Sequence, residues 1–143
     1  MPKVNGLFEA ALFVQDLSRA RDFYQQVVGL EMLQESEVAC VFIVAKRQLL
    51  LLITQEKARA PSKTPGGQVP PCLVRPGETL GAGHIALAVA EAEFDAWRTH
   101  LESKGVEVLS EVASEPGGRS LYFRDPDGHL LELATPGVWK LDW

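Results

Sequence analysis

The chain has 143 residues, of which 46% are hydrophobic and 23% are charged, and its formal net charge is −5. This composition is that of an ordinary globular protein of a single domain. A net negative charge without clusters of lysine and arginine argues against nucleic acid or an anionic membrane as a partner. The first residues lack the pattern of a signal peptide, so we expect a cytoplasmic protein in which Cys40 and Cys72 are reduced thiols, neither a disulfide nor ligands.

Residues 5–55 predict a first module with the order strand, helix and three strands. The apolar run Glu9–Val14 is followed by a helical pattern, for which Asp16 is the expected N-cap and Gly29 the expected stop. Three β-rich runs follow, at 30–38, 40–46 and 48–55. The apolar face of the helix is expected to contain Ala20, Phe23 and Val27.

Residues 82–137 repeat this order as a second module. The run "HIALAV" from His84 matches "EAALFV" from Glu9, and a helix with Phe94, Trp97 and Leu101 on one face is expected to stop at Gly105. Its three strands are expected at 106–113, 119–125 and 129–135. The turn sequence "DPDG" joins the last two.

The chain thus predicts two βαβββ modules in tandem within one domain, 1–143. Between them lies a segment rich in proline and glycine, 56–81, which has no periodicity and is expected to form no regular element. A short tail, 138–143, contains Trp139 and Trp143. We expect both the linker and the tail to border a ligand groove.

One position of the repeat calls for a chemical explanation, because "LLLLIT" in the first module becomes "LLELAT" in the second and Leu51 is thereby replaced by Glu132. An unpaired buried carboxylate costs several kcal/mol. Strand alternation puts Glu132 and His84 on strand faces that are small or polar, and the repeat makes Glu9 equivalent to His84. An imidazole and two carboxylates suit Zn, Fe, Mn, Co or Ni, with positions left open for substrate. The sequence therefore predicts a metal site of Glu9, His84 and Glu132.

Simpler readings of these residues remain open at this point. A single strand histidine is more often structural than ligating, and a single glutamate more often lies at an exposed edge. Tyr122 and Arg124 are compatible with residues that line a pocket and with residues of a solvated strand face. Arg119 is compatible with a solvated charge in a loop and with a residue that binds an anion. We expect two further histidines, His100 and His129, to lie in solvent.

Three stretches, "LFVQDLSRARDFYQQVVGL", "GHIALAV" and "SLYFRDPDGHLLELATPG", resemble the vicinal oxygen chelate superfamily of glyoxalase I, extradiol dioxygenases, fosfomycin-modifying enzymes and bleomycin-resistance proteins. The resemblance implies an α+β fold in which paired βαβββ modules form a U-shaped, incomplete β-barrel with the helices packed outside. It places the family's ligand positions on Glu9, His84 and Glu132. Tyr122 matches a tyrosine that lines the pocket in the fosfomycin-modifying members.

The resemblance implies a lyase, isomerase or dioxygenase that uses one divalent metal ion to chelate a small substrate through neighbouring oxygens and to stabilise an oxyanion. Glu9 and Tyr122 are then the catalytic candidates, and Arg119, Arg124 and Tyr122 are the substrate-binding ones. Extradiol dioxygenases and fosfomycin enzymes generally have histidine in the place of Glu9, and glyoxalase I has a fourth carboxylate in the place of Leu51. Isomerisation, ring cleavage and group addition therefore all stay open.

A metal-free protein that sequesters a small molecule, of the bleomycin-resistance type, is the alternative. In either case we expect a homodimer whose sites are shared between chains, because a lone module leaves a sheet edge unpaired.

Overall fold

The computed structural model describes residues 1–72, 81–115 and 117–139. The chain divides into two compact units, Met1–Gly81 and Ala82–Trp143, and each is described by itself. No helix in the described part of the chain is long and apolar enough to cross a membrane.

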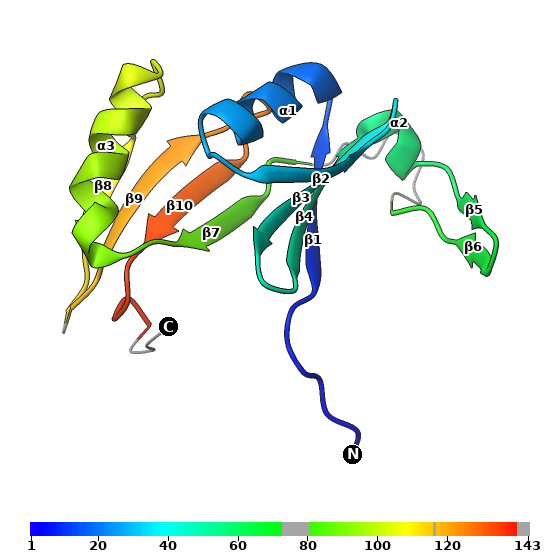
Figure 1. The fold of residues 1–143 in the computed structure, drawn as a ribbon, viewed down its shortest axis with the longest axis horizontal. Coiled ribbons are helices and arrows are strands. Elements are labelled where there is room, and N and C mark those ends of the chain that lie inside the picture. The colour runs from blue at the N-terminus through cyan, green and yellow to red at the C-terminus, as the bar shows by residue number, and fades with distance from the viewer. Residues whose placement is uncertain (73–80, 116, 140–143) are drawn as a thin grey trace. The chain divides into compact units, whose positions relative to one another are not determined.

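The first unit contains a four-stranded sheet with the order β1-β4-β3-β2. β1 is parallel to β4, and the other neighbours are antiparallel, as a βαβββ module requires (Figure 1). The elements are β1 (Glu9–Val14), α1 (Leu17–Gln26), β2 (Glu31–Glu35), β3 (Ala39–Ala45) and β4 (Gln48–Thr54).

Helix α1 begins and ends where the sequence predicts, but it buries a different face. The Asp16 side chain accepts a hydrogen bond from the Arg19 N–H at 3.0 Å, and Gly29 after the helix has a φ of +77°. Within the helix the buried side chains are Ala20 and Tyr24, and Val28 is buried just after its end. Ala20 is thus buried as expected, whereas Phe23 and Val27 are only partly covered. Phe23 with Val27 and Tyr24 with Val28 are two adjacent apolar pairs with the same spacing. The Tyr24 ring packs 6.1 Å from the Phe42 ring on β3, and this contact favours the second pair.

The segment after β4 is more regular than the sequence indicates. It forms a short helix, α2 (Gln55–Ala58), and a hairpin of β5 (Ser62–Thr64) and β6 (Gly67–Val69). The Thr54 hydroxyl caps α2 by accepting from the Lys57 N–H at 3.3 Å. Elements of three or four residues show no recognisable period, which is why the prediction of an irregular segment was wrong here. Residues 73–80 of the expected linker lie outside the described residues.

The second unit repeats the topology of the first, with the sheet order β7-β10-β9-β8 and β7 parallel to β10 (Figure 1). Its second strand, β8, begins later than predicted, at Ser110 instead of residue 106. The elements are β7 (His84–Ala88), a 3-10 turn η1 (Glu91–Glu93), α3 (Phe94–Ser103), β8 (Ser110–Ala113), β9 (Arg119–Arg124) and β10 (Leu130–Ala134).

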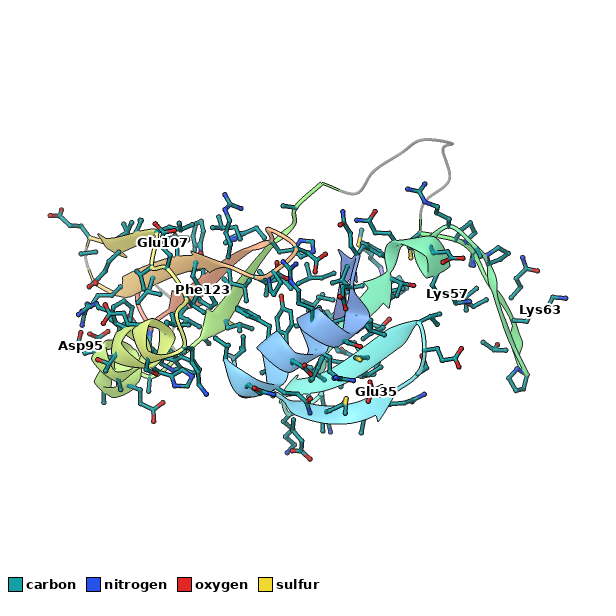
Figure 2. All side chains as sticks on the ribbon, turned by 90° about the horizontal axis from the view of Figure 1, so that it is seen from above. Glu35, Lys57, Lys63, Asp95, Glu107 and Phe123 are labelled. Atoms are coloured by element: carbon teal, nitrogen blue, oxygen red, sulfur yellow. The ribbon has the colours of Figure 1, made fainter. Side chains whose placement is uncertain are left out.

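Helix α3 covers one face of this second sheet. Phe94 and Leu101 of the helix are fully buried, and so are the side chains of Leu121 and Phe123 on β9. Figure 2 labels Phe123 among the side chains of this unit. Strand alternation leaves the other face of β9 to Ser120, Tyr122 and Arg124. The core of this unit therefore occupies one side of its sheet and leaves the opposite side for polar groups.

The strand registers of the two sheets correspond residue by residue. β1 pairs Glu9 with Leu49, and β7 pairs His84 with Leu130. Leu51 and Glu132 each lie two residues further along, so they hold equivalent positions in their sheets. The mixed α+β fold with two βαβββ sheets is confirmed.

The tail is described only as far as Trp139, whose side chain is 78% exposed. Trp143, the second tryptophan expected beside the groove, lies outside the described residues.

Candidate functional site

The polar face of the second sheet brings together His84, Tyr122 and Glu132. Glu132 lies on β10 directly opposite Tyr122 on β9, and its neighbour on β7 is Ala86. His84 precedes Ala86 by two residues, so its side chain emerges on the same face. Regular strand pairing thus gathers the three side chains although they come from three different strands.

A hydrogen bond at Nδ1 of His84 orients the ring and determines how its other nitrogen, Nε2, faces Glu132. His84 Nδ1 lies 3.1 Å from the Leu130 carbonyl oxygen, and because a carbonyl only accepts, Nδ1 must carry the proton. His84 Nε2 lies 3.3 Å from Glu132 Oε2. In a neutral ring, Nε2 then directs a lone pair toward a carboxylate oxygen, an arrangement that a bound cation or a second proton on the ring would stabilise.

This pairing fits a metal ligand set. Metal-binding histidines typically donate their second ring N–H to a carbonyl or carboxylate, which orients the ring and fixes its tautomer. Glu132 is only 7% exposed, and its other oxygen, Oε1, accepts a hydrogen bond from the Ser120 hydroxyl at 2.5 Å. Both donors are therefore held in place by groups that are not themselves ligands.

Tyr122 covers the pair from β9. Its ring stacks on the His84 ring with centroids 6.5 Å apart and an interplanar angle of 26°. Burial raises the pKa of Tyr122, and the charge of Glu132 and a hydrogen bond with Glu132 raise it further, against an opposing hydrogen bond with Ser120. The phenol therefore keeps its proton and is a hydrogen-bond donor on this face, beside Glu132 and Ser120.

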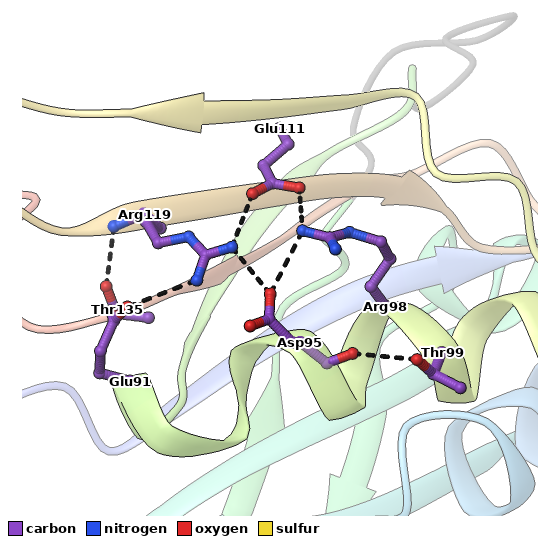
Figure 3. A network of polar contacts seen from close by, with 7 residues as sticks. All are labelled: Glu91, Asp95, Arg98, Thr99, Glu111, Arg119 and Thr135. Atoms are coloured by element: carbon purple, nitrogen blue, oxygen red, sulfur yellow. Dashed lines mark hydrogen bonds and ion pairs between the residues drawn. The ribbon is translucent and has the colours of Figure 1, made fainter.

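Arg119, a candidate for binding an anionic substrate, lies on the other face of the sheet. Its guanidinium forms ion pairs with Asp95 at 2.9 Å, Glu111 at 2.8 Å and Glu91 at 3.5 Å (Figure 3). It also packs 4.0 Å above the Phe94 ring centroid. These contacts tie α3 to the sheet, and the structure does not bring Arg119 to the face that carries His84 and Glu132.

Arg124 differs from Arg119 in this respect. It follows Tyr122 by two residues on β9 and is exposed on the same face. One of its guanidinium nitrogens donates to the Gly128 carbonyl at 2.7 Å, across the turn that joins β9 to β10. Its positive charge therefore lies at the end of the polar face that contains the His84 and Glu132 pair.

Glu9, the third expected ligand, is the first residue of β1 and belongs to the other unit, where it is exposed. Among the residues that the structure describes, no three His, Cys, Asp or Glu side chains form a group that could hold a metal ion. His84 and Glu132 are thus a pair of donors, to which a third donor has to be added for a protein metal site of the usual kind.

His129 was expected in solvent, and this expectation was wrong. It is 4% exposed, and its Nδ1 accepts a hydrogen bond from the Gly83 N–H at 2.7 Å. The backbone N–H of His129 donates to Asp125 Oδ1 at 2.8 Å. The ring therefore anchors the residue before His84, through a contact 46 residues apart in sequence that no local pattern reveals.

Ser120 is the other residue that the sequence analysis did not select. It is 2% exposed and lies two residues before Tyr122, so alternation already places it on the same face. The strand face on which Ser120 lies was therefore predictable from the sequence, whereas its contact with Glu132 was not.

Comparisons with known proteins agree with this fold. Residues 6–133 match the family model of the Glyoxalase/Bleomycin resistance protein/Dioxygenase superfamily. The metallothiol transferase FosB of Shouchella clausii is 31% identical over 92% of this chain and 81% of its own length. The glutathione transferase FosA of Serratia marcescens is 29% identical over 91% of this chain and 80% of its own length.

A solved structure gives the same result. The lactoylglutathione lyase of Agrobacterium tumefaciens superimposes with a TM-score of 0.80 at 30% identity, covering 98% of this chain and 100% of its own. Relatives that are named as transferases and a lyase favour an enzyme of the same superfamily. The chain belongs to the Glyoxalase/Bleomycin resistance protein/Dioxygenase superfamily.

Proposed function

We propose that this protein is a metal-dependent enzyme that binds a small substrate through two neighbouring oxygens. The observation that carries the proposal is the approach of His84 Nε2 to Glu132 Oε2 at 3.3 Å, with Nδ1 engaged by the Leu130 carbonyl. Two electron-pair donors that face each other in this way are stabilised by a positive charge between them, which a divalent ion supplies.

In this proposal His84 and Glu132 hold a divalent ion together with Glu9. Nitrogen and carboxylate donors suit Zn, Fe, Mn, Co or Ni, and three protein ligands leave room for two substrate oxygens. Such an ion supplies Lewis-acid chemistry that stabilises an oxyanion on the substrate. The name of one relative, a metallothiol transferase, supports a metal in the reaction.

The remaining residues of the polar face act on the substrate directly. The protonated Tyr122 phenol donates a hydrogen bond to a substrate oxygen, and Arg124 attracts negative charge to the open end of the face. Glu9 is the candidate for proton transfer. We assign Arg119 to the stability of the module, because its guanidinium is already engaged by three carboxylates.

Thiol-dependent group transfer is the reaction class to test first. Three of the proteins similar to this chain are named a metallothiol transferase, a glutathione transferase and a lactoylglutathione lyase. We do not extend fosfomycin itself to this chain, since Glu9 stands where the resemblance leads us to expect histidine. The proposed substrate class is a small molecule with two adjacent oxygens.

We further propose a homodimer in which Glu9 of one chain completes the site formed by His84 and Glu132 of the other. The pair in the second unit needs a third donor, and the register makes Glu9 the counterpart of His84 in the first unit. An interface of this kind also covers sheet edges.

The test is elemental analysis of protein purified without added metal, followed by melting curves with each candidate ion and with a chelator. We expect bound metal and a metal-dependent rise in melting temperature for the wild type, and neither for His84→Ala or Glu132→Gln. His100→Ala, a histidine variant on α3, is the matched control and should behave as the wild type. A wild type that contains no metal and responds to none of the ions would refute the enzyme and favour the sequestering protein.

A further inference from the structure

We infer that Ser120 is a positioning residue for Glu132, which holds one carboxylate oxygen so that only the other is presented toward His84. The inference rests on the proposed function, because it concerns how the metal ligand is oriented. It goes beyond that proposal by assigning a role to a buried hydroxyl that is not itself a ligand.

The two oxygens of Glu132 have different surroundings. Oε1 accepts the Ser120 hydroxyl at 2.5 Å, within a buried part of the sheet, whereas Oε2 faces His84 Nε2 at 3.3 Å. A hydroxyl donor to a carboxylate makes a charge-assisted hydrogen bond, stronger than one between neutral groups. Rotation of the carboxylate about its last bond would break this contact, so Oε2 stays directed at His84.

The two sheets provide an internal comparison for this pair. Ser120 is paired with Ala134 in the second sheet as Ala39 is paired with Ile53 in the first. The counterpart of Glu132 in the first sheet is Leu51, as the registers show. The sheet without the carboxylate thus also lacks the hydroxyl, which is what a functional unit of Ser120 and Glu132 would require.

The physical consequence concerns the geometry and the affinity of metal binding. A carboxylate that is not held can rotate and present either oxygen or both. Metal binding then also has to overcome the loss of this conformational freedom, which lowers the affinity. Groups that orient a metal ligand typically contribute about 10–100-fold to metal affinity. Loss of the Ser120 hydroxyl should therefore weaken binding without removing any ligand.

The experiment uses the full chain and Co²⁺, whose d–d absorption reports coordination geometry. Affinity is measured by competition with a chromophoric chelator for the wild type, Ser120→Ala, Ser120→Thr and the control Ser110→Ala, an exposed serine of the same sheet. We expect Ser120→Ala to bind Co²⁺ about 10–100-fold more weakly and with an altered absorption spectrum. Ser120→Thr, which retains a hydroxyl, and Ser110→Ala should resemble the wild type.

Melting curves in chelator establish that each variant is folded. If Ser120→Ala is not, Ser120→Val replaces it, since its branched side chain has the shape of Ser120→Thr but no hydrogen-bond donor. The inference is overturned if the folded Ser120 variant binds Co²⁺ with the affinity and spectrum of the wild type, or if Ser120→Thr is as weak as Ser120→Ala. A wild type that does not bind Co²⁺, or that binds it undiminished after His84→Ala, instead refutes the metal site proposed above and the inference with it.

Discussion

His84 Nε2 lies 3.3 Å from Glu132 Oε2, while Nδ1 of the same ring lies 3.1 Å from the Leu130 carbonyl oxygen. The pair is stabilised only when a cation or a second ring proton lies between these two atoms. The stability of the protein should therefore depend on metal through these two residues. Removing one of them should change the free energy of unfolding differently in metal and in chelator.

The change Glu132→Leu, which gives the second module the residue of the first, should abolish stabilisation by metal. A ligand that binds only the native state stabilises it by roughly 4 kcal/mol at a thousandfold excess over its dissociation constant. The wild type should gain melting temperature when a divalent ion replaces chelator, and Glu132→Leu should not. A variant that responds to metal as the wild type does would exclude Glu132 as a ligand.

In chelator, the double variant Glu132→Leu with Ser120→Ala is expected to be more stable than Glu132→Leu alone. The single change removes the carboxylate that accepts from the buried Ser120 hydroxyl and leaves it only Tyr122 as a partner, and the loss of a buried partner costs about 1–3 kcal/mol. The double change reproduces the Leu51 and Ala39 combination of the first sheet, and replacing buried polar or charged groups in this way is often neutral or stabilising by about 1–4 kcal/mol. Urea unfolding in chelator measures both, and equal stabilities of the two variants would contradict the argument.

Co-expression of Glu9→Ala and Glu132→Gln chains should restore metal binding if the site is shared between subunits. A mixed dimer then has one site with both changes and one intact site, whereas each variant alone has none. Metal content of the mixed dimer, purified through two different tags, should approach one ion per two chains. A strictly monomeric protein in solution would refute the dimer, and a mixed dimer without metal would refute the sharing.

His129→Leu should destabilise the protein by about 1–3 kcal/mol, because it removes the acceptor of the Gly83 N–H and leaves that group unpaired. His129→Asn, whose side-chain oxygen can accept a hydrogen bond, should recover part of the loss. Urea unfolding in chelator is the measurement, since it separates this effect from metal binding. A His129→Leu variant as stable as the wild type would show that the buried ring contributes nothing to folding.

Arg119→Gln should reduce stability at neutral pH more than at acid pH. The hydrogen bonds from Arg119 hold the pKa of Asp95 and that of Glu111 below their ordinary values of 3.8 and 4.5. A lowered carboxyl pKa contributes stability above the ordinary value, and that contribution is lost as the pH falls through the lowered pKa. The difference in urea midpoint between the wild type and Arg119→Gln should therefore be full at pH 7 and shrink progressively below about pH 4.

Lys104→Gln is the control for this pH series, because it removes one exposed positive charge on the C-terminal side of α3 without breaking a network. It should change the midpoint little at either pH. A difference for Arg119→Gln that is independent of pH would mean that its packing on Phe94, and not its ion pairs, is what matters.

The alternation of the strands and the two helical patterns were enough to predict both βαβββ modules. These signals are local: a strand shows a period of two residues, a helix begins at a capping Asp16, and Gly29 and Gly105 adopt the left-handed backbone that ends each helix. The position of Arg119 was also available from alternation, since it lies two residues before Leu121 on the face that α3 covers.

Other features could not be predicted, because they depend on which distant residues come together. The sequence placed His84 and Glu132 on strand faces of the same polar kind, but only the parallel pairing of β7 with β10 brings their atoms within 3.3 Å. The burial of His129 against Gly83 and the bond from Ser120 to Glu132 likewise arise from strand register. Register is selected by the packing of whole sheets and helices, so these contacts are decided by the tertiary structure, whereas the elements that make them are decided by the sequence.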